Sequence, residues 1–203
     1  MEIMVCVARP DQLGEVLGVL DEAAAWLQSI GVTRQWPAFY STNDALIAAV
    51  SAHIDLAEVF VARDGPSVIG CFRLSSEPEP RWPGEAAYLS SLAVRRAYAG
   101  RGVARSMLDW AADRAATLGK SELRLDCWAG NAKLRSFYSE AGFEWRGDIE
   151  VVSDGETVPV SEENRGERYF VSLFVRNCQL ADRVLEEAEQ SKQSFDRLRT
   201  NGF

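Results

Sequence analysis

Residues 85–118 have the types and the order of a phosphate-binding loop. An apolar run that is typical of a strand (86–94) is followed by Gly100 and Gly102, and then by a segment in which apolar side chains recur at helical spacing as far as Leu118. The first turn of a helix carries unpaired backbone N–H groups and the positive end of the helix dipole. The sequence therefore predicts an anion-binding site at residues 100–104.

Positive charge is concentrated around these glycines. Arg95, Arg96, Arg101 and Arg105 fall within eleven residues of a chain whose formal net charge is −8. An acidic chain lacks the basic face that general nucleic-acid binding requires, so this local cluster favours a small anionic ligand. The alternative is that the arginines belong to a solvated loop and helix start.

The elements that must position the loop are predicted from apolar periodicity and from turn residues. Helices are expected at 13–30, 42–52, 103–118 and 131–141, the second capped by Ser41 or Thr42 and the first closed by Gly31. Asp64 and Gly65 predict a tight hairpin. Strands are expected at 3–7, 58–63, 67–75, 86–94, 123–128, 143–152 and 169–175.

Length and composition favour one domain with a substantial core. The chain has 203 residues, 47% of them hydrophobic, and contains no apolar run of about 18 residues and no basic, apolar leader. A cytoplasmic protein without membrane contact is expected. The four cysteines have neither CxxC spacing nor a nearby histidine, which favours reduced thiols over a metal site. The only histidine, His53, is expected at a helix end.

Two other phosphate motifs fit poorly. The tripeptide 119–121 resembles the end of a Walker loop, but Arg114 stands where that loop needs glycine, and the tripeptide closes a helix. A dinucleotide fingerprint would need a third glycine where the chain has Arg105.

The segment from Tyr88 to Phe143 resembles the GNAT N-acetyltransferase superfamily. Strand, glycine loop, helix, strand and a helix running from Asn131 to Tyr138 follow one another in that family's order, and the likeness extends over about residues 1–175. The family's loop begins with Gln or Arg, whereas this chain has Ala99, for which Arg96 or Arg101 could compensate. The resemblance implies an α/β fold: a mixed, mostly antiparallel sheet of about seven strands, splayed in the middle, with helices on both faces. Residues 1–176 would form this domain, and residues 177–203 an amphipathic helix and a flexible tail.

The resemblance also implies a reaction and its residues. Acetyl-coenzyme A would donate an acetyl group to a primary amine of a small molecule or protein by direct attack, and Tyr138 would protonate the leaving thiolate. An amide near Leu92 would stabilise the oxyanion. The coenzyme would be bound by the strand, the loop and the following helix start, at Leu92, Ala93, Val94, Ala99, Gly100, Arg101, Gly102, Val103, Ala104 and Asn131. For Tyr138 and Asn131, a core position and a helix cap are the alternatives.

The acceptor side is less defined by the sequence. Trp36 and Tyr88 are the expected walls of the acceptor pocket, with Trp26 and Trp82 as further candidates. The base that deprotonates the amine is open: Glu85 and Asp126 are the nearest carboxylates, and a water chain past Ser90 or Ser91 is the alternative. Transfer of another acyl group, and a non-catalytic acyl-coenzyme A module, are the competing functions. The resemblance and the extra terminal helix suggest a homodimer.

Overall fold

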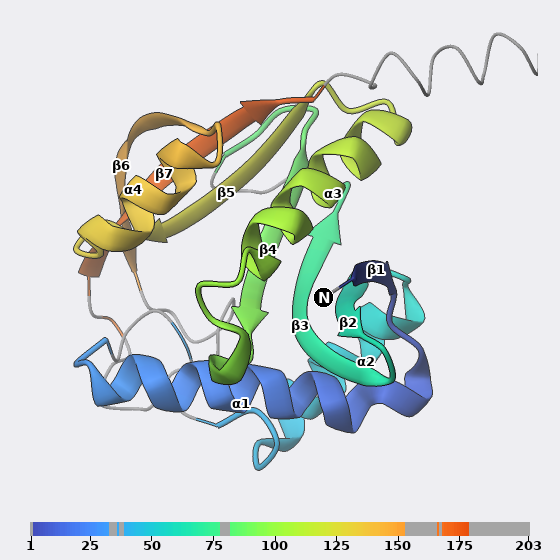
Figure 1. Cartoon of the computed structure of the whole chain (residues 1–203). Helices are drawn as coiled ribbons and strands as arrows, with labels where there is room; N and C mark the ends of the chain where they lie inside the picture. The colour runs from blue at the N-terminus through green and yellow to red at the C-terminus, as the bar shows by residue number, and fades with distance from the viewer. Residues whose placement is uncertain are drawn as a thin grey trace, which may run out of the picture.

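Seven strands form a single sheet in the order β1-β2-β3-β4-β5-β7-β6 (Figure 1). The computed structural model describes residues 2–32, 36, 39–77, 82–152, 166 and 168–178. Every neighbouring pair is antiparallel except β4 and β5, which are parallel. The predicted mixed, mostly antiparallel sheet is confirmed. The strands are β1 (Ile3–Val7), β2 (Val59–Asp64), β3 (Ser67–Ser75), β4 (Ala87–Val94), β5 (Glu122–Trp128), β6 (Glu144–Val152) and β7 (Arg168–Asn177).

Helices cover both faces of the sheet. Helices α1 (Leu13–Ser29) and α2 (Asp44–Asp55) pack on one face, where Val16 and Leu20 join Val61 and Cys71 in one apolar core. Helices α3 (Val103–Thr117) and α4 (Ala132–Glu140) pack on the other face, over a second core around Met107, Leu108, Leu123, Leu125 and Phe174. In Figure 1, α3 runs alongside β4, and α1 crosses the end of β3 and β4.

Strands β4 and β5 separate after a short paired stretch. Their ladder contains only Ala87 opposite Leu123 and Tyr88 opposite Arg124, and the two strands then diverge (Figure 1). On its other side, β4 has a bulge against β3, where Ser91 and Leu92 have no partners in the register and Ser91 has a φ of 55°. A bulge bends a strand and increases its twist, which turns β4 away from β5. The expected splay is therefore present.

Several local predictions can be compared with the structure. Gly31 follows α1 with a φ of 81°, as expected of a residue that ends a helix, and the Asp64-Gly65 hairpin joins β2 to β3. The predicted cap of the second helix was wrong. Asn43 caps α2, because its side chain accepts hydrogen bonds from the N–H groups of Ala45 and Leu46, and the helix extends to Asp55.

Other predictions concern the cysteines and the end of the chain. All four cysteines are free thiols, two of them buried, Cys71 and Cys127. No helix in the described part of the chain is both long and apolar enough to cross a membrane. The helix expected from residue 179 onward lies outside the described residues.

Candidate active site

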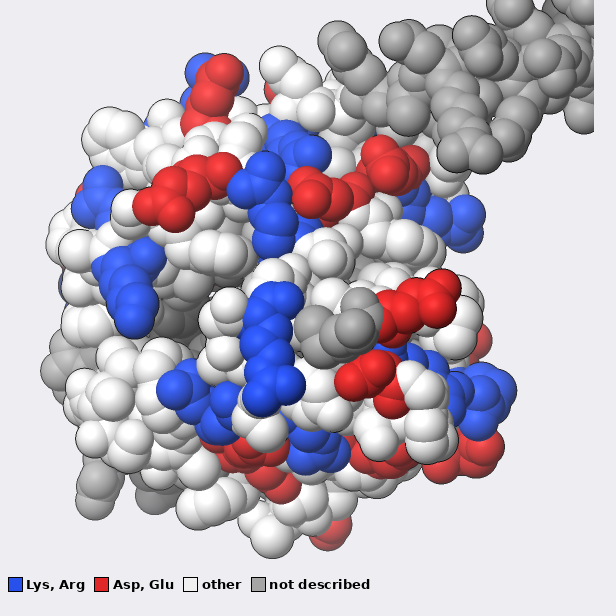
Figure 2. Space-filling view, in the orientation of Figure 1, with Lys and Arg blue, Asp and Glu red and all other residues white. Residues whose placement is uncertain are grey.

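A cavity of about 550 Å³ occupies the space that opens where β4 leaves β5. Its wall combines residues from β4, from the loop before α3, from the start of α3, from α4 and from α1. The basic side chains of Arg96, Arg105 and Lys133 lie on this wall. Figure 2 shows Lys and Arg side chains gathered on this face of an otherwise acidic molecule. The cavity therefore has the size and charge for a large anionic ligand.

The predicted anion loop forms one end of the cavity. Gly100 and Gly102 have φ angles of 75° and 82°, and Gly102 is the N-cap of α3. A Cβ atom at either position would meet no atom within 4 Å, so glycine is required here by the backbone conformation and not by space. Cavity-lining residues from this segment are Ala99, Gly100, Gly102, Val103 and Ala104. Arg101 is not in the lining; its guanidinium lies over the Tyr98 ring.

Helix α1 holds this loop in place. The Glu22 carboxylate pairs with the Arg95 guanidinium at 3.1 Å and accepts a hydrogen bond of 2.6 Å from the backbone N–H of Arg96. The Arg96 guanidinium lies 4.2 Å from the centre of the Trp26 ring. These contacts keep Arg96 on the cavity wall. Sequence analysis missed Glu22, because a contact across more than seventy residues leaves no local pattern.

Strand β4 supplies the middle of the cavity wall. Leu92, Ala93 and Val94, which were predicted to bind the pantetheine arm, all line the cavity, as do Ser90 and Ser91. They lie beyond the last β4–β5 pair, so β5 does not cover their edge of β4. A ligand with amide groups can pair with such a strand edge.

Tyr138 lies on the opposite wall, in α4. Its side chain is 5% exposed, with ring centres 5.6 Å from Phe174 and 6.0 Å from Phe143. Burial raises the pKa of this hydroxyl, and the negative charges of Cys127 and Asp126 raise it further. Tyr138 is therefore protonated at neutral pH. Its position in the core and its position on the cavity wall are not alternatives, since the same side chain does both.

Asn131 also has both of the roles considered for it. Its side-chain oxygen accepts a hydrogen bond of 3.0 Å from the N–H of Leu134, which makes it the N-cap of α4. The same residue lines the cavity. Capping occupies the oxygen and leaves the amide NH₂ as the group with which Asn131 would bind a ligand.

The predicted acceptor residues are separated by the structure. Trp36 lines the cavity together with Trp26, whereas the Trp82 ring lies 4.7 Å from the Arg124 guanidinium and outside the lining. The Tyr88 hydroxyl donates a hydrogen bond of 2.5 Å to the Asp126 carboxylate. Tyr88 is not in the lining, but Asp126 is.

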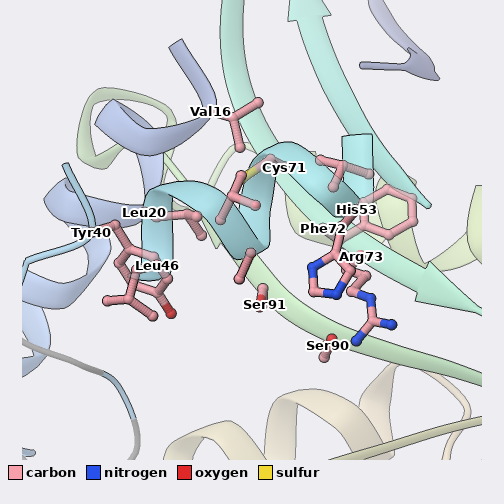
Figure 3. Close-up of a pocket in the computed structure, with 13 residues that line it drawn as sticks. Val16, Leu20, Tyr40, Leu46, His53, Cys71, Phe72, Arg73, Ser90 and Ser91 are labelled. Atoms are coloured by element: carbon pink, nitrogen blue, oxygen red, sulfur yellow. The ribbon is translucent and has the colours of Figure 1, made fainter. Parts of the chain in front are cut away.

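A second, smaller cavity of about 200 Å³ lies between α1, α2 and strands β2 to β4 (Figure 3). It shares Ser90 and Ser91 with the larger cavity. The sequence gave no indication of it, because its wall is assembled from five separate elements.

A mixed sheet that opens between two parallel strands, with an amide-rich loop at one end of the gap, has the architecture of a GNAT-type acyltransferase. The family model described as the acetyltransferase (GNAT) family matches residues 26–143, more than half of the chain. This chain belongs to the GNAT acetyltransferase family. It is an N-acetyltransferase that uses acetyl-coenzyme A.

Individual relatives agree with this family. An uncharacterized N-acetyltransferase of Bacillus subtilis, YesJ, is 30% identical over 151 residues, which cover 70% of this chain and 82% of YesJ. Among solved structures, an N-acetyltransferase from Staphylococcus aureus has a TM-score of 0.64 at 19% identity, and covers 88% of this chain and 100% of its own. The protein yncA from Salmonella typhimurium, solved with its cofactor acetyl-CoA, has a TM-score of 0.62 at 16% identity, with 88% and 95% covered. At these identities the two structures support the fold.

Proposed function

We propose that this chain acetylates a primary amine inside the larger cavity, with Tyr138 as the catalytic acid. One observation carries the proposal: the gap between β4 and β5 joins the loop amides at 100–104 to the Tyr138 hydroxyl in a single cavity. A thioester attached to a diphosphate needs both features. It needs donors for the phosphates and a proton donor for the sulfur.

The coenzyme has a consistent route through this cavity. Its pyrophosphate would lie against the amides of residues 100–104, with Arg96 taking the place of the side chain that the family has at the position of Ala99. Its pantetheine arm would pair with Leu92, Ala93 and Val94. Asn131 would donate a hydrogen bond from its amide. The β4 bulge supports this route, because it leaves Ser91 and Leu92 outside the β3 ladder.

The reaction is direct attack on the thioester. The neutral amine forms a bond to the carbonyl carbon, and a backbone N–H near Leu92 stabilises the oxyanion. The C–S bond then breaks, and the thiolate takes a proton or a strong hydrogen bond from Tyr138. An alkyl amine with a pKa of about 10.4 costs about 4 to 5 kcal/mol to deprotonate at pH 7. Of the two carboxylates considered from the sequence, only Asp126 lines the cavity, which makes it the candidate to accept that proton.

The test is thiol release from acetyl-coenzyme A with a panel of amines, using wild type and Tyr138→Phe. Phenylalanine keeps the ring packed against Phe143 and Phe174 and removes only the hydroxyl. We expect kcat to fall about 10²- to 10⁴-fold, as is typical for loss of a general acid. The Kd for coenzyme A, measured by calorimetry, should stay within about twofold.

Two results would contradict the proposal. One is a Tyr138→Phe enzyme with wild-type kcat, which would remove the acid from Tyr138. The other is a wild-type chain without measurable affinity for coenzyme A, which would remove the coenzyme from the cavity.

Three further assignments stay predictions. We propose residues 1–176 as the catalytic domain, because the matched region and all strands but the last residue of β7 fall inside it. A homodimer and a cytoplasmic location follow from the resemblance and from the sequence. Light scattering tests the former and cell fractionation the latter.

A further inference from the structure

The smaller cavity has an apolar floor and a polar rim. Val16, Leu20, Cys71 and Phe72 are all buried and form part of the floor. Figure 3 shows Leu20, Leu46 and Tyr40 toward one end, His53 and Arg73 toward the other, and Ser90 and Ser91 along β4. Ala49 of α2 lines the cavity and is exposed, so it marks the mouth. The floor can bind carbon chains or rings, since burying them releases water from apolar surface.

The two cavities meet at the place where acetyl transfer would occur. Ser90 and Ser91 line both of them, and the bulge at Ser91 lies directly before Leu92. An amine that attacks a thioester held beside Leu92 is therefore within reach of the smaller cavity. The rest of the acceptor then has that cavity as its neighbouring space.

The charges around the rim select against a second ammonium group. Neither Asp nor Glu is among the described residues that line the smaller cavity. Its cation, Arg73, is paired with Glu58 through Nε at 2.9 Å and Nη2 at 2.8 Å. Burial lowers the pKa of His53, and the charge of Arg73 lowers it further, against an opposing effect of Glu58. An ammonium group placed here would lose water and meet a like charge instead of a carboxylate.

We propose that the smaller cavity holds the apolar part of the acceptor, so that the substrate is a monoamine with a compact apolar chain or ring, and not a diamine or polyamine. This inference rests on the proposed transfer reaction and names the acceptor class for the same site.

A substrate series tests the chemistry of the cavity. Straight-chain amines from ethylamine to hexylamine should show a rise in kcat/KM of about fourfold per added methylene until the cavity is full. Pentylamine should exceed 1,4-diaminobutane, which has almost the same length, at least tenfold. Equal or better use of the diamine, or no dependence on chain length, overturns the proposal.

A pair of variants tests the location. Ala49→Trp puts a large ring at the cavity mouth, whereas Ala48→Trp puts the same ring on an exposed position of α2 that is outside the lining. We expect Ala49→Trp to lower kcat/KM for pentylamine at least tenfold, with a much smaller effect on ethylamine. Ala48→Trp should match wild type. Equal loss in both variants, or no loss in Ala49→Trp, overturns the location.

Calorimetry with coenzyme A separates this inference from the proposed function. If wild type binds coenzyme A and acetylates amines without regard to chain length, only the cavity assignment fails. If it binds coenzyme A but acetylates none of the monoamines, the acceptor class is wrong and the coenzyme site stands. If it does not bind coenzyme A, the proposed function fails first.

Discussion

At the scale of single residues, the surroundings of Tyr138 determine what it can do. Burial raises its pKa, so the hydroxyl holds its proton throughout the neutral range and acts as a hydrogen-bond donor to a developing thiolate. Its ring is fixed by Phe143 and Phe174, which limits the motion of the oxygen. The arginines near the loop differ in the same way: four are close in sequence, but their contacts give them different roles.

Arg96 and Arg101 form a matched pair for testing the phosphate end of the cavity. Arg96 lines the cavity and lies over Trp26, whereas Arg101 lies over Tyr98 and outside the lining. Because a charge-assisted hydrogen bond contributes about 1.5 to 3 kcal/mol, Arg96→Ala should raise the Kd for coenzyme A about tenfold or more. Arg101→Ala, which removes the same charge, should raise it less than about threefold. The measurement is calorimetry at two salt concentrations, and the reverse order would show that Arg101 is the compensating side chain.

At the scale of elements, the loop before α3 depends on its neighbours on both sides. The β4 bulge sets where the chain leaves the sheet, and Glu22 of α1 fixes Arg95 and the Arg96 backbone. The left-handed conformations of Gly100 and Gly102 then turn the chain into α3. The amides that form the anion site are therefore positioned by three elements that are distant in sequence.

Gly102→Ala and Gly31→Ala test whether this conformation serves binding. The φ angles are 82° and 81°, and a Cβ at either position has no atom within 4 Å. Both substitutions should cost about 1 kcal/mol of unfolding free energy, because alanine disfavours the left-handed region. Only Gly102→Ala should also raise the Kd for coenzyme A, by about tenfold, since it moves the amides of the loop. A similar change in Kd for Gly31→Ala would indicate a general effect on the fold.

At the scale of the whole molecule, two apolar cores on opposite faces hold the sheet and bury ionisable groups. Cys71 is 1% exposed in the core beneath α1 and α2. Burial raises its pKa from 9.0 to about 12, and Arg95 opposes this in part. Because the folded pKa is higher than the unfolded one, the stability that this thiol contributes is complete below pH 9. It is lost as the pH rises from 9 toward 12.

The alkaline stability of the protein should therefore depend on Cys71. Between pH 8 and pH 10 the unfolded thiol loses its proton and the folded thiol keeps it. Wild type should lose about 1.4 kcal/mol more unfolding free energy over this interval than Cys71→Ala. Urea denaturation of both proteins at the two pH values measures the difference. An equal loss in both would mean that Cys71 titrates in the folded state as it does in the unfolded state.

The sequence by itself determined the elements, their order and the family. Apolar periodicity predicts where strands and helices lie, and the glycines before α3 mark a helix start suited to an anion, because both signals are local. It also indicated Tyr138 and Asn131, but left open whether each was structural or functional. Local patterns could not decide that, since both residues turned out to serve packing or capping and to line the cavity.

The tertiary structure decided what depends on contacts between distant segments. Which arginine faces the cavity follows from Glu22 and Trp26 of α1, more than seventy residues away. The β4 bulge at Ser91, which joins the two cavities, has no sequence signal, because serine rarely adopts a positive φ and does so here within a packed sheet. The smaller cavity exists only where α1, α2 and three strands meet. Its shape and charge are properties of their packing and not of any one segment.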